Sequence, residues 1–301
     1  MGYTIKKFDI NGEKLLYSMI KALDITERAG KRLIDKGRVK LDGETVTHKG
    51  LRASGEVEVL FYEPTPTNQL MPIFETDDFA VFEKPSFMLS HPNGFHVEEC
   101  MLDSIKKLYG NTANVTHRLD FETSGLIVAS KTKEAESLLK INFENRGMQK
   151  EYTALLQGKL EETKEVECLL ENIKTLEIKI MQGEGENGKY SFSVFEPLEY
   201  FEDQNATLVR IIPKTGRLHQ IRVHSSIIGH PIMGEPIYGN DLDTAKDYLD
   251  KKLSKEERLR RTKASRICLH ASKISFEHKN EHYEISSKTD IRREFLAALF
   301  D

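Results

Sequence analysis

The sequence predicts an α+β protein built of two units, a small amino-terminal one and a larger one dominated by strands. Three observations support this prediction. The length of 301 residues suits roughly two domains. Extended apolar segments outnumber helical ones along most of the chain. Residues 63–69 are polar, contain two prolines and are typical of a stiff linker. We therefore divide the chain into residues 1–66, a small α/β unit with its linker, and residues 67–301.

Composition limits the classes of function. Cys100, Cys168 and Cys268 are odd in number and widely separated, so they predict neither a disulfide framework nor a CxxC metal site. The first residues lack the apolar core of a signal peptide, and no later stretch approaches membrane-spanning length. We therefore expect a cytoplasmic monomer with no membrane contact and no bound metal.

The formal net charge of -4 conceals a basic first unit. Residues 1–62 hold twelve Lys or Arg against nine Asp or Glu, and residues 28–52 hold eight against three. Apolar spacing predicts two short helices there, the second capped by Thr26 and ending near Gly37, followed by small strands. A basic face on such a unit indicates RNA binding. An ordinary solvated helix face is the alternative reading.

Apolar periodicity assigns the elements of the second unit. Its strands are predicted at residues 71–75, 79–83, 126–129, 152–156 and 208–212, with two or three more between 173 and 201 around a polar tip at 183–188. Its helices are predicted at residues 101–109, after a Thr132 cap, after the turn at 213–216, and at 291–300. Residues 251–266 hold eight basic and two acidic side chains, which predicts a charged surface helix or a further RNA contact.

The segment from His117 to Gly125 is the strongest candidate site. In an extended backbone Arg118 and Asp120 project to the same face, directly before the buried strand that begins near Leu126. A neighbouring guanidinium keeps such a carboxylate ionised, and an ionised, partly shielded carboxylate is a competent nucleophile. The ordinary alternative is that Asp120 satisfies turn amides or a salt bridge.

Several segments together resemble one enzyme family. His-Arg-Leu-Asp followed by Thr-Ser-Gly is similar to the catalytic motif of the A-type pseudouridine synthases of the large ribosomal subunit. Further matches follow in the family's order between about residues 78 and 276: Lys84-Pro85, Lys150-Glu151-Tyr152, residues 215–224, Gly229-His230-Pro231 and Leu269-His270-Ala271. The first unit resembles the RNA-binding domain first described in small ribosomal subunit protein four. Ser86-Phe87 departs from the family, which normally has a glycine there, and Glu27 departs from the domain's usual small residue.

The resemblance implies a fold, a reaction and site residues. The fold is a long, mixed, mostly antiparallel sheet with flanking helices and a central cleft. The reaction is the isomerisation of a flipped-out uridine to pseudouridine, for which the resemblance calls for no metal, nucleotide or redox cofactor. Asp120 would attack, Arg217 would hold Asp120 charged, Arg118 would occupy the space left by the flipped base, and Tyr152 would stack on that base.

The resemblance also favours a target. Family members with the amino-terminal RNA-binding domain mostly modify large-subunit ribosomal RNA, whereas those that act on tRNA often lack it. We therefore expect 23S ribosomal RNA as the partner, with tRNA as the alternative. The role of Asp120 as covalent nucleophile or as base stays open. His219 and His224 have no nearby Cys or acidic ligand, so we expect hydrogen bonding or RNA contact from them and no metal.

Two other classes of function remain. A glycoside hydrolase could use Asp120 with Glu122, but it needs two carboxylates across the scissile bond, and the chain has no Trp for a sugar platform. A non-catalytic RNA-binding factor of ribosome assembly would keep the basic unit and the fold. It would not need Asp120, so the intact motif argues for the enzyme.

Overall fold

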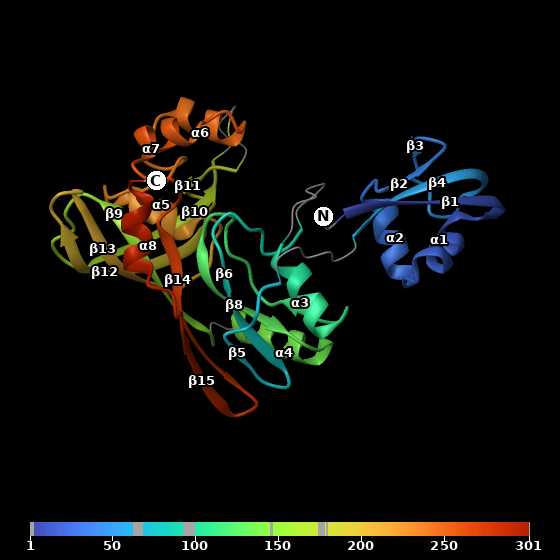
Figure 1. The fold of residues 1–301 in the computed structure, drawn as a ribbon, viewed down its shortest axis with the longest axis horizontal. Coiled ribbons are helices and arrows are strands. Elements are labelled where there is room, and N and C mark those ends of the chain that lie inside the picture. The colour runs from blue at the N-terminus through green and yellow to red at the C-terminus, as the bar shows by residue number, and fades with distance from the viewer. Residues whose placement is uncertain are drawn as a thin grey trace.

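The computed structural model describes residues 3–62, 69–92, 100–144, 147–173, 178 and 180–300. It contains two separate sheets, one of four strands at the amino terminus and one of eleven strands in the remainder (Figure 1). The boundary expected at residue 66 lies outside the described residues. No described helix has the length and apolar character needed to cross a membrane.

The amino-terminal sheet carries two helices on a small apolar core. Its elements are β1 (Tyr3–Lys14), α1 (Leu15–Leu23), α2 (Glu27–Asp35), β2 (Val39–Leu41), β3 (Glu44–Thr45) and β4 (Arg52–Tyr62). The strands lie in the order β1-β4-β2-β3. Met19 and Ile34 of the helices pack on Val57 and Val59 of β4. Thr26 caps α2 as predicted, because its hydroxyl accepts a hydrogen bond from the Ala29 amide at 3.3 Å.

The larger sheet is antiparallel except at one seam. Its strands are β5 (Phe74–Glu75), β6 (Phe79–Lys84), β7 (Asn114–Val115), β8 (Ser124–Ser130), β9 (Gln149–Gln157), β10 (Lys164–Asn172), β11 (Gln182–Glu184), β12 (Lys189–Phe201), β13 (Ala206–Pro213), β14 (Leu269–His278) and β15 (Glu281–Ser286). The main order is β11-β10-β12-β13-β9-β14-β8-β6-β5, with β15 beside β14 and β7 beside β8. Among the described pairs of named strands, only β14 and β8 run parallel.

Helices cover both faces of this sheet. They are α3 (Met101–Tyr109), α4 (Lys133–Glu144), α5 (Gln220–Ile227), α6 (Leu242–Leu249), α7 (Lys255–Thr262) and α8 (Ile291–Ala298). Along β8, Leu126 and Val128 share a core with α4, whereas Ile127 and Ala129 share one with α3. Because successive strand residues point to opposite faces, α3 and α4 cover opposite faces of β8, and the whole strand is buried.

The parallel seam aligns the residues around the predicted site. Gly125 of β8 pairs with Ala271 of β14, which in turn pairs with Tyr152 of β9. Gly125 has a φ of +109°, and a Cβ there would lie 2.3 Å from the carbonyl oxygen of Ala271. Only glycine allows this approach. The seam therefore brings the segment before β8 close to the middle of β9.

Several local predictions differ from the structure. The strand expected at 71–75 is present only as the short β5. The helix expected to carry Arg217 begins later, at Gln220, because His219 takes a left-handed conformation (φ +55°) and forms the N-cap. The charged stretch at 251–266 forms only the short helix α7, preceded by the unpredicted α6 (Figure 1). The polar strands β1 and β10 were not predicted either. Each pairs along a long neighbouring strand, β4 or β12, and each also places apolar side chains in a core, such as Ile10 and Val166.

Candidate active site

The backbone on both sides of Asp120 is held by buried polar groups. The hydroxyl of Ser90 donates to the carbonyl oxygen of Leu119 and accepts from its amide, both at 3.0 Å. The buried ammonium of Lys84 donates to the carbonyl oxygens of Phe121 at 3.1 Å and Met88 at 2.7 Å. Lys84 also donates a hydrogen bond to the carbonyl oxygen of Pro85. The loop that carries Asp120 is thus fixed before any substrate binds.

The carboxylate of Asp120 lies against a buried ion pair. Arg222 on α5 donates through Nη1 to Asp120 Oδ2 at 3.2 Å, and it holds Glu235 through Nε at 2.6 Å and Nη2 at 2.9 Å. The side chain of Asp120 is 29% exposed, whereas those of Arg222 and Glu235 are 5% and 0% exposed. The backbone amides of Ile237 and Tyr238 also donate to Glu235. This second carboxylate fixes the guanidinium in place beside the first.

The electrostatics keep Asp120 ionised. Burial acts to raise the pKa of this carboxyl group, but the charge and hydrogen bond of Arg222, together with His219 and Lys84, hold the pKa below its usual value. Burial acts to lower the pKa of Arg222, yet Glu235 and Asp120 raise it well above the ordinary range. Asp120 therefore carries a negative charge at neutral pH and still reaches solvent.

The imidazole ring of His219 also lies close to the carboxylate of Asp120. Its Nε2 lies 3.9 Å from Asp120 Oδ2, and its Nδ1 lies 2.7 Å from the hydroxyl of Tyr238. Burial and the charge of Arg222 lower the pKa of His219 to about 4, so the ring is neutral at pH 7. The Tyr238 hydroxyl accepts from the Gln182 amide and can donate to Nδ1. That arrangement leaves the imidazole proton on Nε2, facing Asp120.

Tyr152 lies under the site, largely in the core. It is 9% exposed and packs in the same apolar cluster as Leu119. Burial, reinforced by the negative charge of Asp120, raises the pKa of its phenol, so the hydroxyl stays protonated. Burial also lowers the pKa of Lys84 to about 7, against the opposing effect of Asp120. Both residues are thus electrostatically coupled to the same carboxylate.

The predicted pairing of Arg217 with Asp120 is wrong. Arg217 lies in the turn before α5, where its Nε donates to the carbonyl oxygen of Tyr190 at 2.9 Å and its amide donates to Gln220. Arg222 takes the predicted role. Both arginines lie in the same basic stretch, so the sequence holds no local signal that separates Arg222 from Arg217. Arg118 projects to solvent beside the site.

Glu122 has a structural role and is not available as a second catalytic carboxylate. It is 2% exposed and binds both terminal nitrogens of Arg258, at 2.8 Å through Nη1 and also through Nη2. The hydroxyl of Tyr248 donates to it at 2.6 Å and the amide of Ile267 at 3.0 Å. With both oxygens committed, Glu122 does not form the carboxylate pair that a glycoside hydrolase needs.

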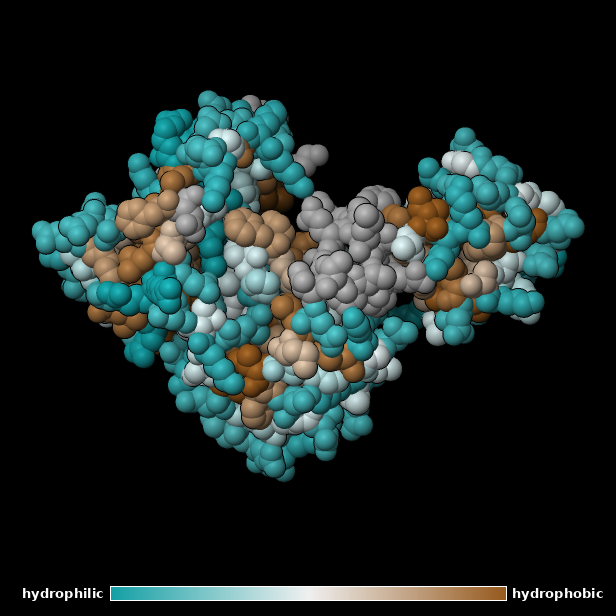
Figure 2. Space-filling model, viewed as in Figure 1, coloured by the Kyte–Doolittle hydropathy of each residue, from teal (hydrophilic) through white to brown (hydrophobic). Residues whose placement is uncertain are grey.

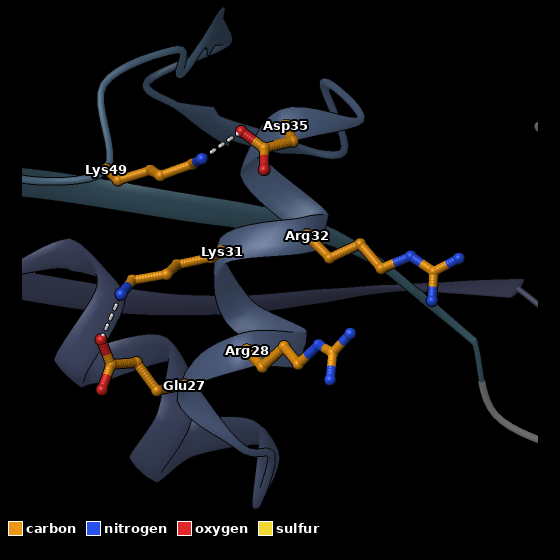
Figure 3. A pocket seen from close by; sticks show the side chains of 6 residues that line it. All are labelled: Glu27, Arg28, Lys31, Arg32, Asp35 and Lys49. Carbon is orange, nitrogen blue, oxygen red and sulfur yellow. Dashed lines mark ion pairs between the residues drawn. The ribbon is translucent and has the colours of Figure 1, made fainter.

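The amino-terminal unit presents a basic surface along α2. A surface hollow is lined by Glu27, Arg28, Lys31, Arg32, Asp35 and Lys49 (Figure 3). Lys31 pairs with Glu27 at 2.5 Å, and Lys49 pairs with Asp35 at 2.6 Å. Arg28 and Arg32 project together from the other side of the helix, away from those pairs (Figure 3). Guanidinium groups presented together on one helix face are well suited to bind RNA phosphates.

Comparison with known proteins places these features in a family. A sequence profile described as RNA pseudouridylate synthase matches residues 78–226. An uncharacterised RNA pseudouridine synthase of Helicobacter pylori (strain J99) is 34% identical over 95% of this chain and 96% of its own length. The dual-specificity RNA pseudouridine synthase RluA of Haemophilus ducreyi is 34% identical over 72% of this chain and 91% of its own.

A solved structure shares the fold. The structure of human RNA Pseudouridylate Synthase Domain Containing 1 aligns with a TM-score of 0.59 at 24% identity. The alignment covers 75% of this chain and 86% of the human one. The predicted α+β class with a mixed, mostly antiparallel sheet is therefore confirmed.

Proposed function

Because the chain belongs to the RNA pseudouridylate synthase family and isomerises uridine to pseudouridine in RNA, we propose that Asp120 performs the reaction and that large-subunit ribosomal RNA carries the target. One observation supports Asp120 above all. Its carboxylate is ionised, partly exposed and held by the buried pair of Arg222 and Glu235.

The chemistry rearranges one bond and one proton within the substrate. The bond from N1 of uracil to C1′ of ribose breaks, the ring turns, and a bond from C5 to C1′ forms. The proton on C5 leaves and N1 gains one, so nothing is oxidised or reduced. Asp120 can serve as nucleophile or as proton acceptor, and both roles require the ionised carboxylate. Arg222 supplies the positive charge that maintains it.

The surrounding residues would bind the flipped nucleotide. We assign to Tyr152 the stacking contact with the uracil ring, since its protonated phenol lies beside Asp120 in the same charge network. Arg118, exposed on the same loop, would occupy the space left in the RNA stack. Arg217 remains our candidate for a substrate contact at the edge of the site, where it would meet a phosphate.

The choice of ribosomal RNA rests on the amino-terminal unit. The dual-specificity relative aligns with 72% of this chain, whereas the Helicobacter relative aligns with 95%. A basic module on a tether raises the local concentration of the catalytic domain near one RNA element. Arg28 and Arg32 on α2 are the proposed phosphate contacts. Such a protein works where ribosomes assemble, in the cytoplasm.

The test compares pseudouridine maps of ribosomal RNA and tRNA from cells with and without the gene. At least one 23S position should lose its modification and regain it when the wild-type gene returns. Asp120→Asn should not restore it, although the variant should fold and bind RNA, because Asn keeps the shape and loses the charge. Loss confined to tRNA would contradict the target, and restoration by the Asn variant would contradict the role of Asp120.

A further inference from the structure

Phe87 has a backbone conformation that bulky residues rarely adopt. It lies in the turn after β6 with a φ of +61°, in the left-handed region. Its ring is nonetheless 49% exposed, so apolar burial does not account for the residue. A large aromatic side chain in an unfavourable conformation at the surface of an active site is a candidate for function.

A second exposed ring lies beside Phe87. Phe121, the residue after Asp120, is 36% exposed. The two ring centroids are 5.9 Å apart with an interplanar angle of 74°, an edge-to-face contact. The guanidinium of Arg258 lies 5.9 Å from the centroid of the Phe87 ring. The two rings therefore form one exposed surface beside Asp120, and the buried guanidinium of Arg258 lies close to the Phe87 ring.

Hydrogen bonds fix the two rings relative to Asp120. The amide of Met88 donates to the carbonyl oxygen of Phe121 at 3.2 Å, and the hydroxyl of Ser86 donates to that of Glu122 at 2.7 Å. Lys84 bridges the same two segments through the carbonyls of Met88 and Phe121. Arg258 is itself held by Glu122. The aromatic pair is therefore preformed, and substrate binding need not order it.

We propose that Phe87 and Phe121 form a stacking platform for an unpaired nucleobase that neighbours the reacting uridine in the RNA. This inference rests on the proposed function, because it takes RNA as the occupant. Exposed aromatic rings bind single-stranded bases through their faces, and a nearby cation adds to that attraction. Since Arg118 would fill the gap left in the stack, the platform is proposed for an adjacent base that leaves the stack together with the uridine, about one nucleotide from the reacting position.

The test uses the full-length enzyme and a stem-loop RNA containing the uridine mapped in the deletion strain. Each nucleotide within two positions of that uridine is replaced in turn by an abasic one, and kcat/KM is measured. One abasic position should lower kcat/KM of the wild type by roughly 5- to 150-fold, the range expected for loss of one base stack. The same abasic substitution should lower kcat/KM of Phe121→Leu and Phe87→Gly much less. These variants lack the platform, so they gain little from the base even when it is present.

Controls separate the platform from folding and from the reaction itself. Phe87→Gly relieves the left-handed backbone, so its Tm should not fall, and an activity loss in it is not a loss of structure. Phe300→Leu changes a more exposed phenylalanine on another part of the chain, 73% exposed, and should behave as wild type. Equal abasic penalties in wild type and both platform variants would overturn the platform while leaving the proposed function standing. Absence of pseudouridine formation by the wild type on every RNA would instead overturn the proposed function, and the platform with it.

Discussion

The charge of Asp120 depends on a residue 102 positions later in the chain. Burial alone would favour the protonated carboxyl group, and Arg222 reverses that preference. Glu235 has no contact with Asp120 among the described hydrogen bonds, but it orients the guanidinium that does. The ionised state of Asp120 therefore depends on three side chains, one from the loop before β8, one from α5 and one from the turn that follows α5.

Arg222→Gln should shift the pH dependence of turnover. Without the guanidinium, burial raises the pKa of Asp120, so the acidic limb of the kcat profile moves to higher pH. Arg222→Lys keeps a positive charge and should shift the acidic limb less. It provides a second test if the Gln variant does not fold. Arg217→Gln is the matched control, because the Arg217 side chain contacts Tyr190 and not Asp120. In this variant KM should rise, and the pH of the acidic limb should not change. An unmoved limb in Arg222→Gln would show that another group keeps Asp120 ionised.

At the scale of residues, the sequence predicts which carboxylate is the candidate better than it predicts which side chains contact that carboxylate. Asp120 was found because one carboxylate lies within an Arg-containing motif before a buried strand. Arg222 was not assigned, because its position depends on the left-handed His219, which delays the start of α5 by three residues. Neither Glu235 nor the ring contact of Phe87 and Phe121 has a local sequence signal, since both depend on how distant loops meet.

At the scale of elements, Glu122 joins the catalytic loop to the helices α6 and α7. Tyr248 comes from α6, Arg258 from α7 and the Ile267 amide from the segment before β14. Arg258 also donates to the carbonyl oxygen of Gly234. The face of this lobe seen in Figure 2 is largely hydrophilic. Beneath it, Ala245 and Tyr248 of α6 pack in an apolar cluster with Val223, so the polar anchor and apolar packing position the lobe together.

Glu122→Gln should therefore destabilise the protein strongly. The substitution leaves the buried guanidinium of Arg258 without its counter-charge, a change that costs about 3–5 kcal/mol in other buried pairs. Urea denaturation measures the free energy of unfolding. Glu199→Gln is the matched control, because the pair of Glu199 and Arg292 is exposed and its loss should change stability little. Equal costs for the two variants would contradict the anchoring role.

The elements that could be predicted are those with local signals. The helix at 101–109 and the Thr132 cap of α4 follow from apolar spacing and capping chemistry, and both are present. Strand β1 alternates charged and apolar residues weakly, and it is stable because it pairs with β4 over most of its length. Such strands are determined by a partner that lies far away in the sequence, which local periodicity does not reveal.

At the scale of the whole molecule, buried histidines make stability depend on pH. Burial lowers the pKa of His219, His224 and His270 to about 4, and that of His117 well below the ordinary value. The unfolded chain binds protons at these rings below about pH 6.5, whereas the folded protein does not. The contribution of these rings to folding stability is therefore complete above that pH and is lost as the pH decreases toward 4.

Urea denaturation between pH 7 and 4 should show this loss before the carboxylates contribute at lower pH. His224→Asn should reduce the slope, since its ring is fully buried against Ser191. His282→Gln, at an exposed position on β15, serves as the control and should leave the slope unchanged. A flat stability curve between pH 6.5 and 4 would contradict the neutral state of the buried rings.

The amino-terminal unit should contribute to binding and not to the chemical step. Replacing Arg28 and Arg32 together by Gln should raise KM for ribosomal RNA, leave kcat at saturation unchanged, and reduce the salt slope of binding by about 1.4–1.8 for two lost phosphate contacts. Lys31→Gln, whose ammonium pairs with Glu27, is the matched control and should change the slope less. An unchanged slope in the double variant would locate the RNA contact elsewhere.

The position of β14 has a consequence for synthesis on the ribosome. This strand lies between β9 and β8 in space but follows both of them by more than a hundred residues in sequence. At about 5–20 residues per second, the earlier strands wait several seconds or longer in the nascent chain before their shared neighbour is made. Throughout that interval β8 and β9 expose the edges that β14 later covers. The amino-terminal sheet can close long before, so the RNA contacts proposed for the first unit can form while the larger sheet is still open.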